Sequence, residues 1–134
     1  MIQKENKKIK LVIIGAGPAG LTASIYASRY AISNIVISKD IGGQASESFK
    51  IENFPASAPI SGFDWSQKVA EQAKGFGAEI INDNVKSVEK TGDEFKILTE
   101  AGREFTSNVL LVASGMERRK LKIKGEKELS GKGV

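Results

Sequence analysis

The sequence predicts an α/β fold: a parallel sheet that starts with a βαβ unit and has an antiparallel β-meander inserted in it. Three observations predict this. Short β-branched runs alternate with helical segments, a glycine-rich turn joins the first run to the first helix, and three alternating segments separated by turn residues follow. The chain has 134 residues, which is enough for about one domain.

The βαβ unit lies at the start of the chain. Residues 9–14 form an apolar run typical of a buried strand, and NIVIS at residues 34–38 forms a second one. Between them, Pro18 stands where the first helical turn tolerates proline, because its missing N–H has no partner inside the helix. We expect this helix to pack on the sheet through a face of small residues that recur every four positions: Ala19, Ala23 and Ala27.

The middle of the chain predicts a loop followed by a second helix. Residues 39–62 have no clear periodicity and contain paired glycines and two prolines, which predicts a long ordered loop. Ser61, with Asp64 three residues later, is typical of a capping box that begins a helix. We expect that helix to end at Gly75 or Gly77.

The second half of the chain predicts strands. Residues 78–81 form a third parallel strand, and residues 109–113 (VLLVA) predict a separate, fully apolar one. Between these lie three short alternating segments that predict the meander, VKSVEK, EFKILTE and REFTS. We expect residues 1–115 to be the amino-terminal portion of a domain and the charged, glycine-punctuated residues 116–134 to be a connector.

Composition narrows the chemistry. The chain has no cysteine and no histidine, which excludes disulfides, thiolate chemistry, Cys- or His-based metal sites and a Ser-His-Asp triad within it. The net charge of +4 comes without a nucleic-acid-binding motif, so we expect no nucleic-acid contact. No apolar run is long enough to cross a membrane, and glycines and Pro18 interrupt the one run that imitates a secretory signal. We therefore expect a cytoplasmic protein.

Residues 15–20, GAGPAG, fit the pattern G-x-G-x-x-G between a strand and a helix, the arrangement of a Rossmann-like dinucleotide site. The first glycine permits the tight turn, the second lets backbone approach a pyrophosphate, and the third lets helix and strand pack closely. The alternative is a tight turn that binds nothing. The candidate pyrophosphate-binding residues are Gly15, Ala16, Gly17, Pro18, Ala19 and Gly20.

In such sites an acidic residue at the end of the second strand usually binds a ribose hydroxyl. Here Ser38 and Lys39 occupy that place, and Asp40 comes slightly late. Ser38 can still hydrogen-bond a ribose, whereas we expect Lys39 to be more exposed. Ser38 and Lys39 are both candidate cofactor-binding residues. The lack of an acidic residue at this place argues against a simple NAD site.

Six stretches of the sequence follow one another in a specific order: VIIGAGPAGLTASIYASR, GGQ, IENFP, FGAEI, LLVASG and RKLKIKGE. In these stretches the chain resembles the amino-terminal part of bacterial-type, low-molecular-weight thioredoxin reductases, which are FAD-dependent pyridine nucleotide-disulfide oxidoreductases. The order and spacing of the stretches are more specific than any one of them. IENFP favours thioredoxin reductases over the related ferredoxin–NADP reductases.

The resemblance implies FAD as the cofactor of this domain. It implies that Gly15 to Gly20 hold the pyrophosphate. The residues that it implies along the flavin are Gly42, Gly43 and Gln44, with Asn53 near the isoalloxazine. The resemblance also implies that Asn84 and Val85 flank the adenine. Ala113, Ser114 and Gly115 would lie against the cofactor at the end of their strand. One departure is Ala56, which follows Pro55 where the family usually has glycine.

The resemblance also implies a function. The parent would be a homodimer that passes electrons from NADPH through FAD and a redox dithiol to thioredoxin. In the family, the NADPH domain with its Cys-x-x-Cys pair and a last segment that completes the FAD domain follow a region like GKGV. We expect both to lie outside this chain, which would contain no catalytic residue and be inactive alone. The alternatives are part of a related flavin reductase (ferredoxin–NADP reductase or a peroxiredoxin-reducing flavoprotein subunit) and a stand-alone nucleotide-binding module without catalysis.

Overall fold

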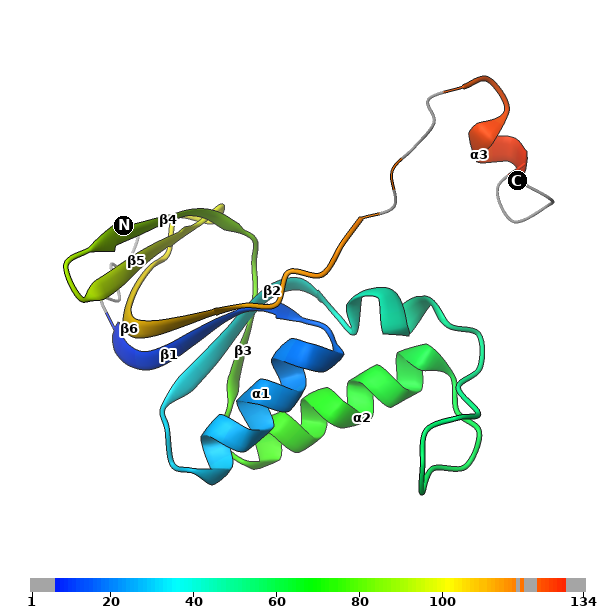
Figure 1. Ribbon diagram of the computed structural model, residues 1–134, viewed down its shortest axis with the longest axis horizontal. Coiled ribbons are helices and arrows are strands. Elements are labelled where there is room, and N and C mark those ends of the chain that lie inside the picture. The colour runs from blue at the N-terminus through cyan, green and yellow to red at the C-terminus, as the bar shows by residue number, and fades with distance from the viewer. Residues whose placement is uncertain (1–6, 118, 120–122, 130–134) are drawn as a thin grey trace.

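The computed structural model describes residues 7–117, 119 and 123–129. A six-stranded sheet with the order β3-β2-β1-β6-β5-β4 forms its centre, and two helices pack on one face (Figure 1). β1 runs parallel to β2 and β6, and β2 to β3, whereas β4, β5 and the start of β6 pair antiparallel. The predicted α/β fold with an inserted meander is confirmed. The elements are β1 (Lys7–Ala16), α1 (Pro18–Arg29), β2 (Asn34–Ile41), the 3-10 helix η1 (Gly43–Glu47), α2 (Gly62–Gly75), β3 (Glu79–Asn82), β4 (Val85–Thr91), β5 (Glu94–Thr99), β6 (Glu104–Val112) and α3 (Glu126–Leu129).

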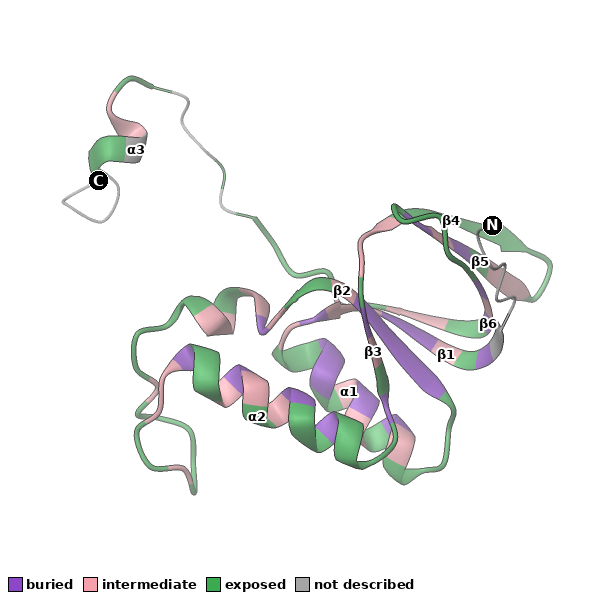
Figure 2. Cartoon of the chain, turned by 180° about the vertical axis from the view of Figure 1, so that it is seen from behind, coloured by how far each residue is buried: buried purple, intermediate pink, exposed green. Residues whose placement is uncertain are grey.

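Two apolar clusters, one on each face of the sheet, make up the core. Figure 2 shows buried residues along β1 and β2 and on the faces of α1 and α2. On the helix side, Ile13 and Val36 pack with Leu21 and Ala70. The other cluster joins the parallel strands to the meander and contains Ile9, Val12, Ile35, Ile37, Ile81, Ile97 and Phe105. Burial on both faces explains why the parallel strands have continuous apolar runs.

Helix α1 begins at Pro18 as predicted, and two of the three residues of the predicted alanine face pack inward: Ala27 is buried and Ala23 packs, partly buried, against the core, whereas Ala19 does not. Its buried residues are Gly20, Leu21, Ser24 and Ala27, while Ala19 is exposed. The prediction for Ala19 was wrong because Gly20 lies directly on the backbone of Gly15, where a Cβ would collide with its carbonyl oxygen. That contact fixes the rotation of the helix and turns Leu21, rather than Ala19, into the core.

Helix α2 begins with the predicted capping box. The Ser61 Oγ accepts a hydrogen bond from the Asp64 N–H at 3.0 Å, and the helix ends at Gly75. The predicted loop before it is not wholly irregular, since it contains η1 and an antiparallel bridge between Ile51 and Ile60.

Strand β6 differs from the prediction. The sequence suggested two strands, REFTS and VLLVA, yet Glu104–Val112 form one continuous strand. Ser107, the last residue of the first segment, is fully buried and pairs with Ile9 of β1 on one side and Phe95 of β5 on the other, and the pairing with β1 continues past Asn108 at Val109. β5 pairs with β6 only as far as Ser107. Beyond that point, Val109 and Val112 are 54% and 64% exposed.

Candidate functional site

A groove of about 540 Å³ lies across the carboxyl ends of β1, β2 and β6. Crevices at this edge of a parallel sheet are where open α/β folds bind ligands. Four segments supply the wall: the glycine turn before α1, the end of β2, η1, and the chain that follows β6. The lining residues are Gly15, Ala16, Gly17, Pro18, Ala19, Ser38, Asp40, Gly43, Gln44, Ser46, Glu47, Ala113, Ser114, Gly115, Met116 and Glu117.

Two of the three motif glycines are required by the fold itself. Gly15 has a φ of 103°, and a Cβ there would collide with the carbonyl oxygen of Ala113. Gly20 lies against Gly15 in the same way. These glycines let the strand, the turn and the helix approach closely. The fold therefore requires both of them, whether or not a ligand binds.

Gly17 is different. It has a φ of −76° and a ψ of −178°, an extended conformation open to any residue. The nearest atom to an added Cβ is the carbonyl oxygen of Gly42, 4.0 Å away. Neither backbone conformation nor packing within the protein therefore requires glycine here. A Cβ at Gly17 would occupy only the groove, next to the first residues of α1.

The start of α1 suits an anion. Gly17 is the N-cap and makes no side-chain capping bond, Pro18 follows it, and no acidic residue lies in the first turn. The first N–H groups of a helix lack partners inside it and carry a partial positive charge. Backbone N–H groups beside an unobstructed Gly17 form the kind of site that binds phosphate.

The end of β2 contributes Ser38 and Asp40 to the groove, but not Lys39. Side chains alternate between the faces of a strand, so residues 38 and 40 share a side and residue 39 faces the other way. Sequence reasoning set Asp40 aside because it expected the strand to end at Ser38. β2 instead continues to Ile41. The acidic residue near the second strand was the signal for a ribose site, but its position relative to the end of the strand was misjudged.

The paired glycines after β2 have separate roles. Gly42 has a φ of 98°, its N–H donates to the Ala16 carbonyl at 2.8 Å, and it lies behind the groove. Gly43 and Gln44 line the groove, and Gln44 Nε2 donates to the carbonyl of Met116 at 3.3 Å. That bond joins η1 to the chain after β6. Sequence reasoning did not identify four further lining residues: Ser46, Glu47, Met116 and Glu117.

The remaining candidate residues lie in different places. Ala113, Ser114 and Gly115 line the groove, directly after β6. Asn53 is exposed in the loop between η1 and α2, and it is not part of the lining. Asn84 and Val85 lie at the crossover from β3 to β4, also outside the lining. The cofactor contacts of Asn53, Asn84 and Val85 stay predictions.

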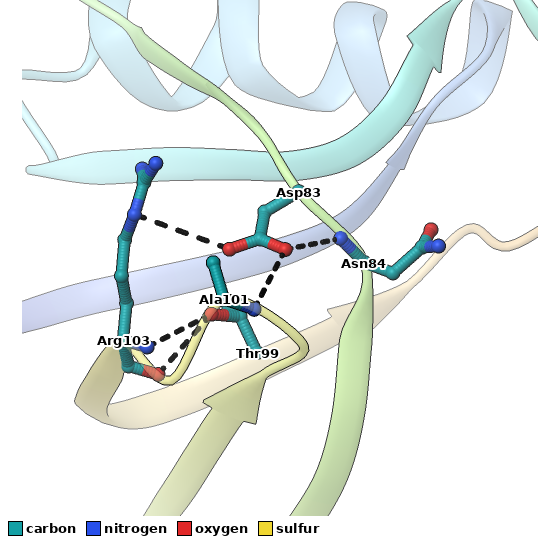
Figure 3. Close-up of polar contacts among 5 residues, drawn as sticks. All are labelled: Asp83, Asn84, Thr99, Ala101 and Arg103. Carbon is teal, nitrogen blue, oxygen red and sulfur yellow. Dashed lines mark hydrogen bonds and ion pairs between the residues drawn. The ribbon is translucent and has the colours of Figure 1, made fainter.

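The crossover is organised by the nearly buried carboxylate of Asp83 (Figure 3). Its side chain is 7% exposed; Oδ1 accepts the N–H of Asn84 at 2.8 Å and of Ala101 at 3.3 Å, and Oδ2 lies 3.9 Å from Arg103 Nε. The Thr99 hydroxyl does most to lower the pKa of Asp83. The two N–H groups and Arg103 lower the pKa further, and burial opposes them.

Within residues 7–117, 119 and 123–129, no group of three or more Asp or Glu side chains is arranged to hold a metal ion. Over the same residues, no helix is long and apolar enough to cross a membrane.

Comparison with known proteins gives consistent matches. The family model described as pyridine nucleotide-disulphide oxidoreductase matches residues 9–134. The thioredoxin reductase of Bacillus subtilis is 40% identical over 131 residues, which cover 97% of this chain and 41% of that protein. The thioredoxin reductase of Aquifex aeolicus is 40% identical over 136 residues, covering 100% of this chain and 42% of the relative.

Solved structures agree with the sequence matches. The crystal structure of Lactococcus lactis thioredoxin reductase superposes with a TM-score of 0.83 at 38% identity, over 92% of this chain and 41% of that one. The crystal structure of T. acidophilum thioredoxin reductase gives 0.82 at 30% identity, over 96% and 42%. The chain therefore spans only about two fifths of the length of the relatives that it matches.

Proposed function

Because the chain belongs to the pyridine nucleotide-disulphide oxidoreductase family, we propose that it is the FAD-binding, amino-terminal segment of a thioredoxin-disulfide reductase. The similarity to thioredoxin reductases at about 40% identity over nearly the whole chain favours this function over a ferredoxin–NADP reductase, a peroxiredoxin-reducing subunit or a stand-alone module. The observation that carries the proposal is the open space beside Gly17 at the start of α1.

The residues of the groove fit a dinucleotide. Gly17 and the first N–H groups of α1 would receive the pyrophosphate, and Ser38 and Asp40 offer oxygens to a ribose. At the start of η1, Gly43 and Gln44 offer close backbone approach and an amide to a flat ring. Bound FAD would supply the hydride- and electron-transfer chemistry, while the protein binds and orients it.

The activity that we propose for the whole protein is electron transfer from NADPH to the disulfide of thioredoxin. Disulfide exchange needs a thiolate, and these 134 residues contain no cysteine. The redox dithiol and the NADPH site would therefore be supplied by residues outside this chain. The reduced state of a dithiol enzyme suits a reducing compartment, which supports a cytoplasmic location. A homodimer is proposed on the family resemblance alone.

The test is a Gly17→Val substitution in the intact protein. A Cβ at Gly17 has no protein atom nearer than the Gly42 carbonyl oxygen at 4.0 Å and extends into the groove. The variant should therefore fold normally and purify with less than about a tenth of the wild-type flavin. Flavin content is measured as the visible absorbance per mole of protein, and folding by circular dichroism. Gly75→Val is the matched control, because a Cβ at Gly75 also meets nothing within 4 Å but lies at the end of α2, outside the groove.

Full flavin content in Gly17→Val would contradict the proposal. Equal flavin loss in both variants would mean that the loss follows destabilisation of the fold rather than obstruction of the groove. The stand-alone module is tested separately by titrating FAD into the 134-residue chain, where tight stoichiometric binding would favour it.

A further inference from the structure

We propose that Glu47 and Glu117 are specificity-determining residues for the charge of the flavin ring. Their carboxylates make the η1 end of the groove favour the neutral, oxidised ring over the negatively charged, reduced ring, and so lower the reduction potential of bound FAD. This inference rests on the proposed function, since it places the flavin ring beside Gly43 and Gln44 at the start of η1.

The two glutamates come from segments that a hydrogen bond joins. Glu47 is the last residue of η1, and Glu117 belongs to the chain that follows β6. Gln44 Nε2 in η1 donates to the carbonyl of Met116, the residue before Glu117, at 3.3 Å. Both glutamates line the same groove as Gln44, and both are exposed to it and to solvent. Their carboxylates therefore belong to the part of the wall that would surround the flavin ring.

The position of η1 is fixed by close packing on the start of α2. A Cβ at Gly42, just before η1, would collide with the side chain of Ser66 in α2. A Cβ at Gly62, the first residue of α2, would collide with the carbonyl oxygen of Ala45 in η1. The Gly62 N–H also donates to the carbonyl of Ser48 at 2.8 Å, directly after η1. The carboxylate at the end of η1 is thus attached to a segment that α2 holds beside the groove.

The charges along the groove differ between its parts. The start of α1 favours negative charge through its free N–H groups, next to Gly17. Among the lining residues that the structure describes, three are acidic (Asp40, Glu47 and Glu117) and none is Lys or Arg. A negative charge that develops beside η1 would therefore be repelled by two nearby carboxylates, with no cation of this lining to offset them.

Reduction of the flavin creates such a charge. In the proposed function, NADPH gives up a hydride, which is two electrons and one proton, and becomes NADP⁺. The neutral flavin ring accepts that hydride and so gains one negative charge near neutral pH. If the protein binds the reduced cofactor less tightly than the oxidised one, linkage requires the potential of bound FAD to fall by the same free energy. A lower potential makes the flavin a stronger reductant, which suits a protein that reduces a disulfide.

The test measures the reduction potential of the intact, flavin-loaded protein. The flavin is equilibrated with a reference redox dye near neutral pH, and both are followed by visible absorbance. Glu47→Gln and Glu117→Gln should each improve the binding of reduced over oxidised FAD by about threefold. The double variant should improve it by about tenfold, which raises the potential of a two-electron couple by ~30 mV. The gain should shrink at high ionic strength, because both carboxylates are exposed.

Two controls separate charge from other effects. Glu52→Gln removes the same charge from an exposed residue that lies outside the lining and is ion-paired to Lys50 at 2.7 Å, so it should leave the potential unchanged. Glu47→Asp and Glu117→Asp keep the negative charge and should retain the wild-type potential. All of these residues are exposed, so their replacement is compatible with folding, which circular dichroism checks.

An unchanged potential in the double Gln variant would overturn the proposal, and so would an equal rise in Glu52→Gln. A rise that the Asp variants reproduce would overturn it as well, because the charge is still present in them. An intact protein that does not bind FAD at all would instead count against the proposed function.

Discussion

Replacement of Asp83 should lower stability in a way that depends on pH. In Asp83→Ala, the N–H groups of Asn84 and Ala101 lose their acceptor. The Asn84 N–H is partly buried, whereas the Ala101 N–H is exposed and can bond to water instead. Hydrogen bonds to a charged acceptor contribute about 1.5–3 kcal/mol each, so we expect a total loss of about 2–4 kcal/mol. Asp83→Asn keeps an oxygen for both donors but removes the charge, and should cost about 1–2 kcal/mol. Arg103 adds little, because its side chain is 52% exposed and lies 3.9 Å away.

The sign of the pH dependence follows from the lowered pKa of Asp83. A carboxylate with a lowered pKa in the folded state contributes fully above its unfolded value of 3.8, and the contribution is lost as the pH falls through the folded value. The difference in unfolding free energy between wild type and Asp83→Asn should therefore be constant from about pH 7 to 5 and shrink below about pH 4.

Urea denaturation followed by circular dichroism measures these free energies, and amide hydrogen exchange at Ala101 reports the local loss directly. Glu100→Gln is the control, since Glu100 is an exposed carboxylate in the same corner, hydrogen-bonded to Asn84 Nδ2 at 3.0 Å. It should change stability by less than about 0.5 kcal/mol. If Asp83→Asn matches the wild type at pH 7, or if the difference persists unchanged at pH 3.5, the role assigned to this carboxylate is refuted.

Three other predictions concern single positions and the chain alone. Ala56 has a φ of 62°, in the region that favours glycine, so Ala56→Gly should raise the free energy of unfolding by up to ~1 kcal/mol in urea titrations; no gain would mean that the residue is unstrained. Gln44→Ala and Asn53→Ala in the flavin-loaded protein should alter the flavin spectrum or turnover more than the melting temperature, since both side chains are exposed, Gln44 in η1 and Asn53 in the loop after it. Unchanged spectra and turnover would return them to ordinary surface roles. Because Val109 and Val112 are exposed where β5 no longer covers β6, the 134-residue chain alone should bind FAD weakly. A submicromolar Kd with a cooperative melt would contradict this.

The sequence predicted what local chemistry determines. Pro18 and Ser61 begin helices because their own side chains favour those positions, and both helices start where expected. It failed where tertiary contacts decide. Ser107 is buried between its partner strands β1 and β5, and the two strands predicted around it form a single strand, β6. The close contact of Gly20 with the glycine turn sets the rotation of α1. Asp40 was set aside because the length of β2 depends on its pairing with β1, which no local pattern encodes.

The strand order has a consequence for how the chain folds. β6 is the last strand in the described part of the chain, yet it lies in the middle of the sheet and pairs there with both β1 and β5. Its pairing brings Lys7 beside Phe105. Closing a loop of that length costs roughly 4 kcal/mol of chain entropy. The β1–β2–β3 unit and the β4–β5 hairpin can therefore share a core only after β6 has paired with both. We expect this step to make folding slow and all-or-none.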